Sequence, residues 1–309
     1  EKLYYRPKKE REPIDFLSKK KVFFTISLVL IAAGVITIGV NAGRGKGAFA
    51  YSLEFQGGTS TNVTFDKDYS IDEIDKEIVP VVEKVTGDNN VQTQKVAGTN
   101  QVIIKTVTLD LDKREALNKA MVDNFGVDES KITAENISST VSNEMRRDAV
   151  IAVVIATICM LLYIWFRFKD IRFATSAVLA LLHDVLVVVG FYAIARISVG
   201  NTFIACMLTI VGYSINATIV IFDRIREEMR GKTKSSDIAA VVNKSITQTL
   251  TRSIYTSLTT FIMVAVLYVM GVSSIKEFAL PLMVGVVCGA YSSVCITGAL
   301  WYVMKRFKK

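Results

Sequence analysis

Six long runs of apolar residues constrain this chain more than any other feature. Apolar residues make up 51% of its 309 residues, which is high for an ordinary soluble domain. Each run is long enough to cross a hydrocarbon core of about 30 Å as a helix that rises about 1.5 Å per residue. The sequence therefore predicts an α-helical membrane protein with six transmembrane helices. The runs are Val22–Val40, Ala149–Phe166, Phe173–Ala195, Thr202–Phe222, Ser253–Met270 and Phe278–Met304.

The charged residues are distributed unevenly between the two sides of these runs. Residues 41–148 carry more acidic than basic side chains, whereas the short segments on the other side are net basic. Because short basic segments stay in the cytoplasm, we predict that both termini are cytoplasmic and that 41–148 is extracytoplasmic. The net charge of +8 then reflects membrane topology and does not indicate a nucleic-acid partner. The predicted organisation is a basic N-terminal segment (1–21), a first transmembrane helix (22–40), an extracytoplasmic domain (41–148), a five-helix transmembrane region (149–304) and a basic tail (305–309).

The extracytoplasmic domain has the pattern of a small α+β fold. Ile71–Val85 follows a candidate N-cap, Ser70, and repeats its apolar residues at helical spacing. Two alternating segments after it predict a hairpin. The predicted order is β-α-β-β-α-β, which is that of a ferredoxin-like sheet with two helices on one face. The other elements are a strand pair or a bent strand over Tyr51–Phe65, interrupted at Gly57-Gly58, the hairpin strands Val91–Val96 and Gln101–Thr108, a helix Asp112–Asn124 and a strand Lys131–Ser139.

Nothing in the sequence indicates an enzyme. Residues 41–148 contain no histidine, no cysteine and no nucleophile beside a base, so the groups that catalysis uses are missing. The four cysteines all lie in predicted spans, without the spacing of a disulfide framework or a zinc site. We expect no cofactor and no metal.

Polar residues inside the spans are the candidate functional residues. A polar group in hydrocarbon costs free energy unless it finds a partner, so such groups face the interior of a bundle or a water-filled path. The third span contains His183 and Asp184, and the fourth contains Asn216 and Thr218. The fifth span begins with a polar stripe made of Thr249, Arg252, Thr256 and Thr260.

Four motifs follow one another along the chain: Leu53–Thr59 with its Gly57-Gly58-Thr59, Leu182–Val185 with its His183-Asp184, Val211–Glu227, and Gln248–Thr260 with Arg252. Together with the predicted topology they resemble the SecF family, the protein-export subunits of the bacterial SecDF accessory complex. The resemblance covers nearly the whole chain from about Phe16.

This resemblance implies a half-transporter in the bacterial cytoplasmic membrane. Its six spans would form one half of a bundle of the resistance-nodulation-division type, paired with a SecD-like half. The implied partners are that half, a SecYEG-type translocon, a YajC-like small subunit, membrane lipid and the exported unfolded polypeptide. The implied function is to assist Sec-dependent translocation with energy from the proton or sodium gradient.

One position departs from the family pattern. Family members usually carry Asn-Asp-Thr in the fourth span, where the aspartate is a proposed proton carrier that faces the arginine of the fifth span. This chain has Asn216-Ala217-Thr218, and alanine can neither bind a proton nor neutralise Arg252. Three accounts stay open: the SecD-like half supplies the carrier, Asp184 takes the role, or Ala217 is an engineered substitution that traps one state.

Asp184 lies near the middle of its span, where an unpaired carboxyl is expected to be neutral because burial disfavours the charged form. It is either a proton site, with His183 beside it or Arg252 as charge partner, or a structural carboxyl that packs the bundle. We expect the two side chains to point apart, because positions i and i+1 do not share a helix face. His183 is accordingly either a member of a proton relay or a hydrogen-bonding residue between helices. Arg252 either takes part in ion coupling or extends its charged end to the cytoplasmic interface of the membrane.

The remaining motif residues have structural interpretations. Gly57 and Gly58 let the backbone turn or approach closely where a side chain would clash. Asp223 and Arg224 come at the end of a helix, where we expect a solvated cap. The apolar stripe of residues 238–250 is expected to lie on the membrane surface.

Two other functions compete with the transport hypothesis. One is a non-conducting structural subunit that stabilises a SecD-like partner, which Ala217 favours. The other is a small-molecule or lipid exporter of the same superfamily, which the short extracytoplasmic domain disfavours. The first residue is Glu1 rather than methionine, which fits a processed product, an excised segment or the second half of a fused polypeptide.

Overall fold

The computed structural model describes residues 12–44, 47–88, 91–96, 98–167, 170–230, 237–271 and 273–306. Parts of the predicted N-terminal segment (1–11), tail (307–309) and link (231–236) therefore lie outside the described residues. The chain divides into a helical unit, Glu1–Phe49, Val154–Ile197 and Thr202–Lys309, and a sheet unit, Ala50–Val153 and Ser198–Asn201.

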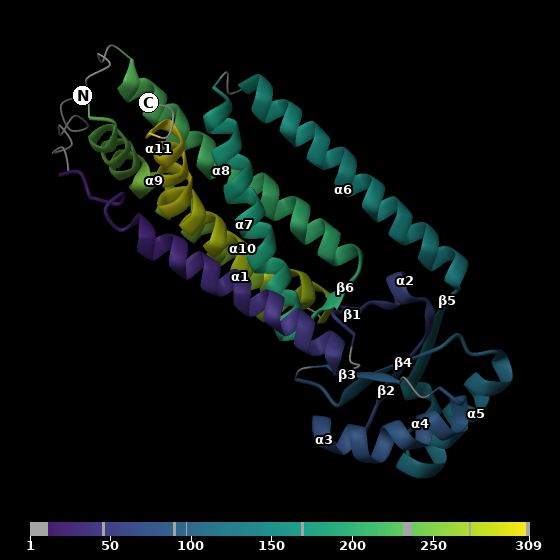
Figure 1. Cartoon of the computed structure of the whole chain (residues 1–309). Coiled ribbons are helices and arrows are strands. Elements are labelled where there is room, and N and C mark those ends of the chain that lie inside the picture. The colour runs from purple at the N-terminus through teal and green to yellow at the C-terminus, as the bar shows by residue number, and fades with distance from the viewer. Residues whose placement is uncertain are drawn as a thin grey trace, which may run out of the picture. The chain divides into compact units, whose positions relative to one another are not determined.

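Helices make up nearly all of the helical unit (Figure 1). Among the described residues, six helical stretches are long and apolar enough to cross a membrane, as the hydropathy pattern predicts. They are α1 (Lys20–Gly43), α6 (Ser139–Arg167, shared with the sheet unit), α7 (Ile171–Ala195), α8 (Asn201–Met229), α9 (Ile238–Met270), and a last stretch built from α10 (Ser273–Tyr291), the π-helix η3 (Ser292–Thr297) and α11 (Gly298–Arg306).

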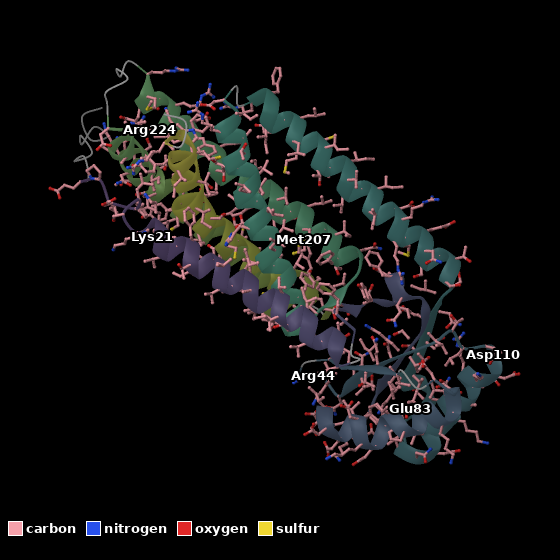
Figure 2. All side chains as sticks on the ribbon, in the orientation of Figure 1. Lys21, Arg44, Glu83, Asp110, Met207 and Arg224 are labelled. Atoms are coloured by element: carbon pink, nitrogen blue, oxygen red, sulfur yellow. The ribbon has the colours of Figure 1, made fainter. Side chains whose placement is uncertain are left out.

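The centre of the helical unit is formed by α7 and the last stretch. Both are largely buried, whereas α1, α6 and α9 expose most of their apolar side chains. Helix α7 packs against α1, α10, η3 and α11. The start of α1 and the end of α11 lie at the same end of the unit (Figure 1). Figure 2 places Lys21 and Arg224 at that end and Arg44 at the opposite end of α1.

Two helices begin earlier than hydropathy predicts. Helix α6 starts at Ser139 rather than Ala149, and α9 starts at Ile238 rather than Ser253. The apolar stripe of residues 238–250 was expected on the membrane surface, and that expectation is wrong. Val242 and Ile246 are fully buried in the core of the helical unit, because an apolar stripe buries area as well against protein as against lipid.

Close helix contacts in this unit depend on glycines. A Cβ atom on Gly34 of α1 would lie 2.7 Å from the Cα of Gly190 on α7. On α10, a Cβ atom on Gly285 would lie 2.3 Å from Cδ1 of Ile210 on α8. Glycine lets helix backbones approach to distances that any side chain would prevent.

We expect Gly34→Ala to destabilise the helical unit by about 1–3 kcal/mol, because the new methyl group forces α1 away from α7. Gly39→Ala on the same helix is the matched control, since a Cβ atom there meets no atom within 4 Å. Thermal unfolding of the purified chain in detergent measures both. Equal melting temperatures for the two variants would contradict the close contact.

The sheet unit is an α+β structure, and from β2 onward its elements follow the predicted order. Its four-stranded antiparallel sheet has the order β3-β4-β2-β5. Helical residues from Ile71 to Thr86 connect the first two of its strands along the chain, and α5 precedes the last. The elements are β2 (Gly58–Thr64), α3 (Ile71–Glu73), η1 (Ile74–Ile78), α4 (Val79–Thr86), β3 (Gln92–Lys95), β4 (Gln101–Thr106), α5 (Leu111–Phe125), η2 (Glu129–Lys131) and β5 (Ile132–Ile137).

The helices cover one face of this sheet. Alternate residues of β4, Val102 and Ile104, are buried against Ile78 of η1 and Leu117 of α5 in one apolar core. The predicted N-cap is confirmed, because Ser70 Oγ accepts a hydrogen bond from the backbone N–H of Glu73 and the Glu73 carboxylate accepts one from the Ser70 N–H. This reciprocal pair is a capping box.

The segment before β2 differs from its prediction. The sequence predicts a strand pair or a bent strand over Tyr51–Phe65, but Leu53–Gln56 forms the short helix α2. Before it, β1 (Ala50–Tyr51) pairs in parallel with β6 (Ser198–Val199), which comes from the connection between α7 and α8. A two-residue pairing across such a sequence distance leaves no periodic signal.

Candidate functional site

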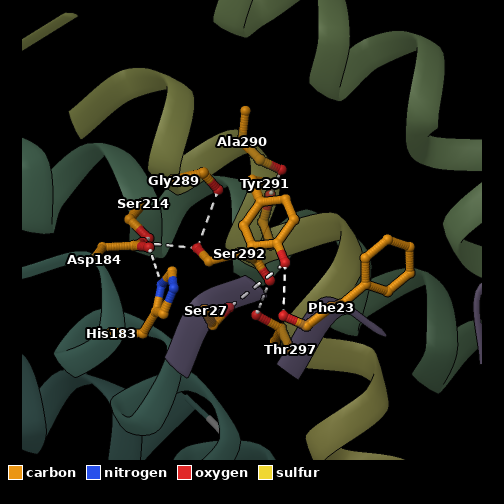
Figure 3. A network of polar contacts seen from close by, with 11 residues as sticks. Phe23, Ser27, His183, Asp184, Ser214, Gly289, Ala290, Tyr291, Ser292 and Thr297 are labelled. Carbon is orange, nitrogen blue, oxygen red and sulfur yellow. Dashed lines mark hydrogen bonds and ion pairs between the residues drawn. The ribbon is translucent and has the colours of Figure 1, made fainter. Parts of the chain in front are cut away.

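The side chain of Asp184 is fully buried in the middle of α7 and is surrounded by hydrogen-bond donors (Figure 3). Ser214 of α8 donates to Asp184 Oδ2 over 2.5 Å, and Ser292 of η3 donates to the same oxygen over 2.7 Å. The Nδ1 atom of His183 lies 2.9 Å from Asp184 Oδ1. Three helical elements therefore meet at one carboxyl group.

The π-helix η3 positions Ser292 in this cluster. A π-turn inserts an extra residue into a helix and is found frequently at functional sites. Its backbone is supported by Thr297, whose hydroxyl donates to the Ser292 carbonyl over 3.0 Å. The preceding residue, Tyr291, donates to the carbonyl oxygen of Phe23 over 2.8 Å. Consecutive residues thus bind the buried carboxyl and helix α1 (Figure 3).

His183 differs from its expectation. We expected its ring to point away from Asp184, whereas the structure brings Nδ1 to the carboxyl oxygen. The side chain of His183 is 7% exposed. Its ring reaches the carboxyl of the adjacent residue because both side chains can rotate toward the boundary between the two helix faces. Its Nε2 atom has no hydrogen-bond partner among the described residues.

The groups around Asp184 can accommodate its carboxyl group in either the protonated or the ionised form. Two serine hydroxyls supply hydrogen bonds to one oxygen of this carboxyl, Oδ2. Binding of a proton at Oδ2 would turn that oxygen into a donor and force Ser214 or Ser292 to find another acceptor. A proton bound at Asp184 would therefore change the contacts among α7, α8 and η3.

The fourth-span motif lies on α8, beyond Ser214. Asn216 is exposed in this chain, Ala217 is half-buried and Thr218 is buried. The Thr218 hydroxyl has no hydrogen-bond partner among the described residues. The structure brings neither Asn216 nor Thr218 to the carboxyl of Asp184 by any hydrogen bond that it records in these residues.

Arg252 of α9 is exposed, and within the described ranges it makes no ion pair with Asp184 or with another acid. Other members of its stripe bond to their own helix: Thr249 donates to Ser245, Thr256 to Arg252 and Thr260 to Thr256. These intrahelical bonds satisfy the hydroxyl groups without a partner on a neighbouring helix. The roles of Arg252 and Asp184 in coupling stay predictions.

Asp223 and Arg224 join helices rather than forming a solvated cap. Asp223 forms an ion pair with Arg167 of α6. Arg224 donates from Nε to Gln248 of α9 over 2.6 Å, and it pairs with Glu228 over 2.9 Å. The bonds hold the charged end of α8 against two neighbouring helices.

Gly57 and Gly58 have backbone conformations that favour glycine. Their φ angles are +72° and +119°, and a Cβ atom on Gly58 would lie 2.2 Å from the carbonyl oxygen of Thr106. The next residue, Thr59, accepts a hydrogen bond from the Leu109 N–H over 2.8 Å and donates to Asn136. The motif therefore fixes the start of β2 between β4 and β5.

Ser214, Tyr291 and Ser292 are site residues that the sequence prediction missed. Hydroxyl side chains occur throughout the spans and usually bond to their own helix, so they give a weak signal. The adjacent pair Ser292-Ser293, in the middle of an apolar stretch, is the signal that could have indicated a polar contact.

Comparison with known proteins gives consistent matches. The family described as protein export membrane protein SecD/SecF, C-terminal, matches residues 117–307. Protein translocase subunit SecF of Petrotoga mobilis is 37% identical over 96% of this chain and 98% of its own length. Protein translocase subunit SecDF of Bacillus subtilis is 36% identical over 94% of this chain, which spans 38% of that longer protein. The crystal structure of SecDF from Thermus thermophilus, a translocon-associated membrane protein, superposes with a TM-score of 0.82 at 30% identity and covers 95% of this chain and 39% of that one.

Proposed function

Because the chain belongs to the SecF family and is a SecF-like subunit of a protein translocase, we propose that it couples Sec-dependent export to the proton or sodium gradient. The observation that carries the proposal is the carboxyl of Asp184, which is fully buried among hydroxyl and imidazole groups from three helical elements. Ionisable groups inside a membrane are costly and usually mark an ion pathway.

Asp184 is the titrating group in this proposal, and Ala217 leaves the usual position without one. His183, whose Nδ1 atom lies 2.9 Å from Asp184 Oδ1, is a second titratable group at this site. Proton binding would exchange the Ser214 and Ser292 bonds, and so change how α8 and η3 pack against α7. Arg252 and Asn216, exposed in the single chain, would face the partner half.

The test is gradient-dependent export of a reporter preprotein into vesicles that contain this chain and its partner half. We expect the unmodified chain to respond to the gradient, and Ala217→Asp to respond to a similar extent, because the carrier lies elsewhere. Ala217→Asn is the matched control, since it has the same shape without a titratable group. A response by the Ala217→Asp variant alone would overturn the role of Asp184.

The partner is a SecD-like half, separate or fused, because homologous SecDF chains contain both halves. We further propose that the assembly works with a SecYEG-type translocon, a YajC-like subunit and the unfolded exported polypeptide. The protein would lie in the cytoplasmic membrane with both termini inside and residues 41–148 outside. The net basic ends of the chain support this orientation.

We also propose a fold for the extracytoplasmic domain and for the bundle of spans. The sheet order β3-β4-β2-β5, with two helical segments between strands, supports a ferredoxin-like fold for residues 41–148. The six candidate spans and the SecDF match support one half of a resistance-nodulation-division type bundle.

A structural subunit without ion coupling is the second candidate function. Ala217 favours it, as does Arg252, which makes no ion pair among the described side chains. Complementation with Arg252→Ala separates the two candidates. Loss of export with assembly intact supports coupling, and unchanged export supports the structural subunit.

A further inference from the structure

A cavity of about 260 Å³ lies at the end of the helical unit where α7 begins and α8 and α11 end. None of its lining residues belongs to the cluster around Asp184. Three of its seven lining residues are cationic and only one is acidic. The lining residues are Asp170, Phe173, Arg226, Met229, Arg230, Trp301 and Lys305.

The positive charge of this cavity is only partly compensated. The Asp170 carboxylate caps α7 by accepting the Arg172 N–H over 3.0 Å, and the Nε atom of the Arg172 side chain lies 3.8 Å from the same oxygen. Arg226 has one distant acidic partner, Asp223 at 3.8 Å. Neither Arg230 nor Lys305 forms a salt bridge within the described part of the chain.

The cavity also has an aromatic wall. The ring of Trp301 stacks on Phe173 with centroids 4.8 Å apart, and the Lys305 ammonium lies 4.6 Å from the centroid of the Trp301 ring. This cation–π contact holds the lysine at the wall. Trp301 is only 1% exposed, and its indole N–H has no hydrogen-bond partner among the described residues.

We propose that this cavity binds a phosphate-bearing anion, either the headgroup of an anionic lipid or free phosphate. Arginine and lysine side chains donate charge-assisted hydrogen bonds to phosphate oxygens. The ends of the transmembrane helices lie at the level of lipid headgroups, where basic pockets between helices bind anionic lipids. The site does not depend on ion coupling through Asp184.

The experiment counts bound molecules on the full chain in neutral detergent by native mass spectrometry. The chain is titrated in separate arms with phosphatidylglycerol, with phosphatidylcholine and with inorganic phosphate. We expect one tight phosphatidylglycerol site, which Arg230→Gln/Lys305→Gln weakens by about tenfold or more, because each cation near the headgroup contributes about 1 kcal/mol.

The matched control is Lys19→Gln/Lys21→Gln, which removes two exposed charges at the start of α1, outside the cavity. It should leave the affinity unchanged. Competition of inorganic phosphate against phosphatidylglycerol would identify free phosphate as the ligand, whereas binding of the lipid alone would identify the headgroup. If the double variant fails to fold in a melting test, Lys305→Gln alone is used, with an expected loss of about fivefold.

Three results would overturn the proposal. The first is equal weakening by the cavity variant and the control, which would indicate general surface charge. The second is equal affinity for phosphatidylcholine and phosphatidylglycerol in the absence of phosphate binding. The third is no bound lipid or phosphate on the unmodified chain.

Discussion

Asp184→Asn is expected to reduce export in the presence of the ion gradient to the level seen without it. Asparagine has nearly the shape of aspartate and keeps one oxygen for the Ser214 and Ser292 hydroxyls, which lie 2.5 and 2.7 Å from the carboxyl. It cannot bind or release a proton. Assembly with the partner half is therefore expected to persist while the response to the gradient is lost.

Two serine variants test whether the hydrogen bonds to Asp184 matter. Ser292→Ala removes one donor to the buried carboxyl, which costs about 1–3 kcal/mol, and should shift the pH dependence of export. Ser293→Ala removes a buried hydroxyl on the same π-helix that, within the described ranges, donates only to Ala290, and should leave the pH profile unchanged. Export assays in vesicles across a pH series measure both.

The prediction for Asp184 would be contradicted by a full gradient response of Asp184→Asn in an assembled complex. The carrier would then belong to the partner half. Identical pH profiles of the Ser292 and Ser293 variants would show that the bonds to Asp184 only stabilise the bundle.

Gly58→Ala should prevent correct folding of the sheet unit. The backbone at Gly58 has a φ angle of +119°, which costs a non-glycine residue about 1–3 kcal/mol. Its Cβ atom would also lie 2.2 Å from the Thr106 carbonyl oxygen, within the pairing of β2 and β4. Because this backbone cannot move without breaking the sheet, we expect a total loss of about 3 kcal/mol or more.

Gly87→Ala is the control for the backbone effect. Gly87 has a φ angle of +73° at the end of α4, but a Cβ atom there meets no atom within 4 Å. Its cost should be limited to about 1–2 kcal/mol for the left-handed conformation. Limited proteolysis of the purified chain measures both, and equal resistance of the two variants would contradict the close contact with Thr106.

Much of the fold could be predicted because the relevant signals are local. The capping box at Ser70 and Glu73 needs only residues three apart, and it appears in the structure as expected from Ser70. The hairpin of β3 and β4 likewise has two alternating segments with a short connection. Helix starts were less predictable, since α6 and α9 begin with a polar or amphipathic helical segment that precedes the apolar run.

The candidate site could be predicted only in part. Asp184 and His183 were identified because charged or ionisable side chains are rare within apolar runs. Their partners could not be found in the same way: Ser214 and Ser292 are 30 and 108 residues from Asp184 along the chain. Whether a serine bonds to its own helix or to a neighbouring carboxyl depends on which helices pack together.

The sequence by itself determined the six candidate spans, because a chain in lipid must satisfy its backbone hydrogen bonds internally and long apolar runs do so as helices. It also determined the order of strands and helices from β2 to β5, but not β1, α2 and β6. Only the tertiary structure decided which polar groups meet in the bundle. It also decided that the apolar stripe of residues 238–250 packs against protein rather than lipid. The reason is that the free energy of a buried polar or apolar group depends on its neighbours, and those neighbours come from distant parts of the chain.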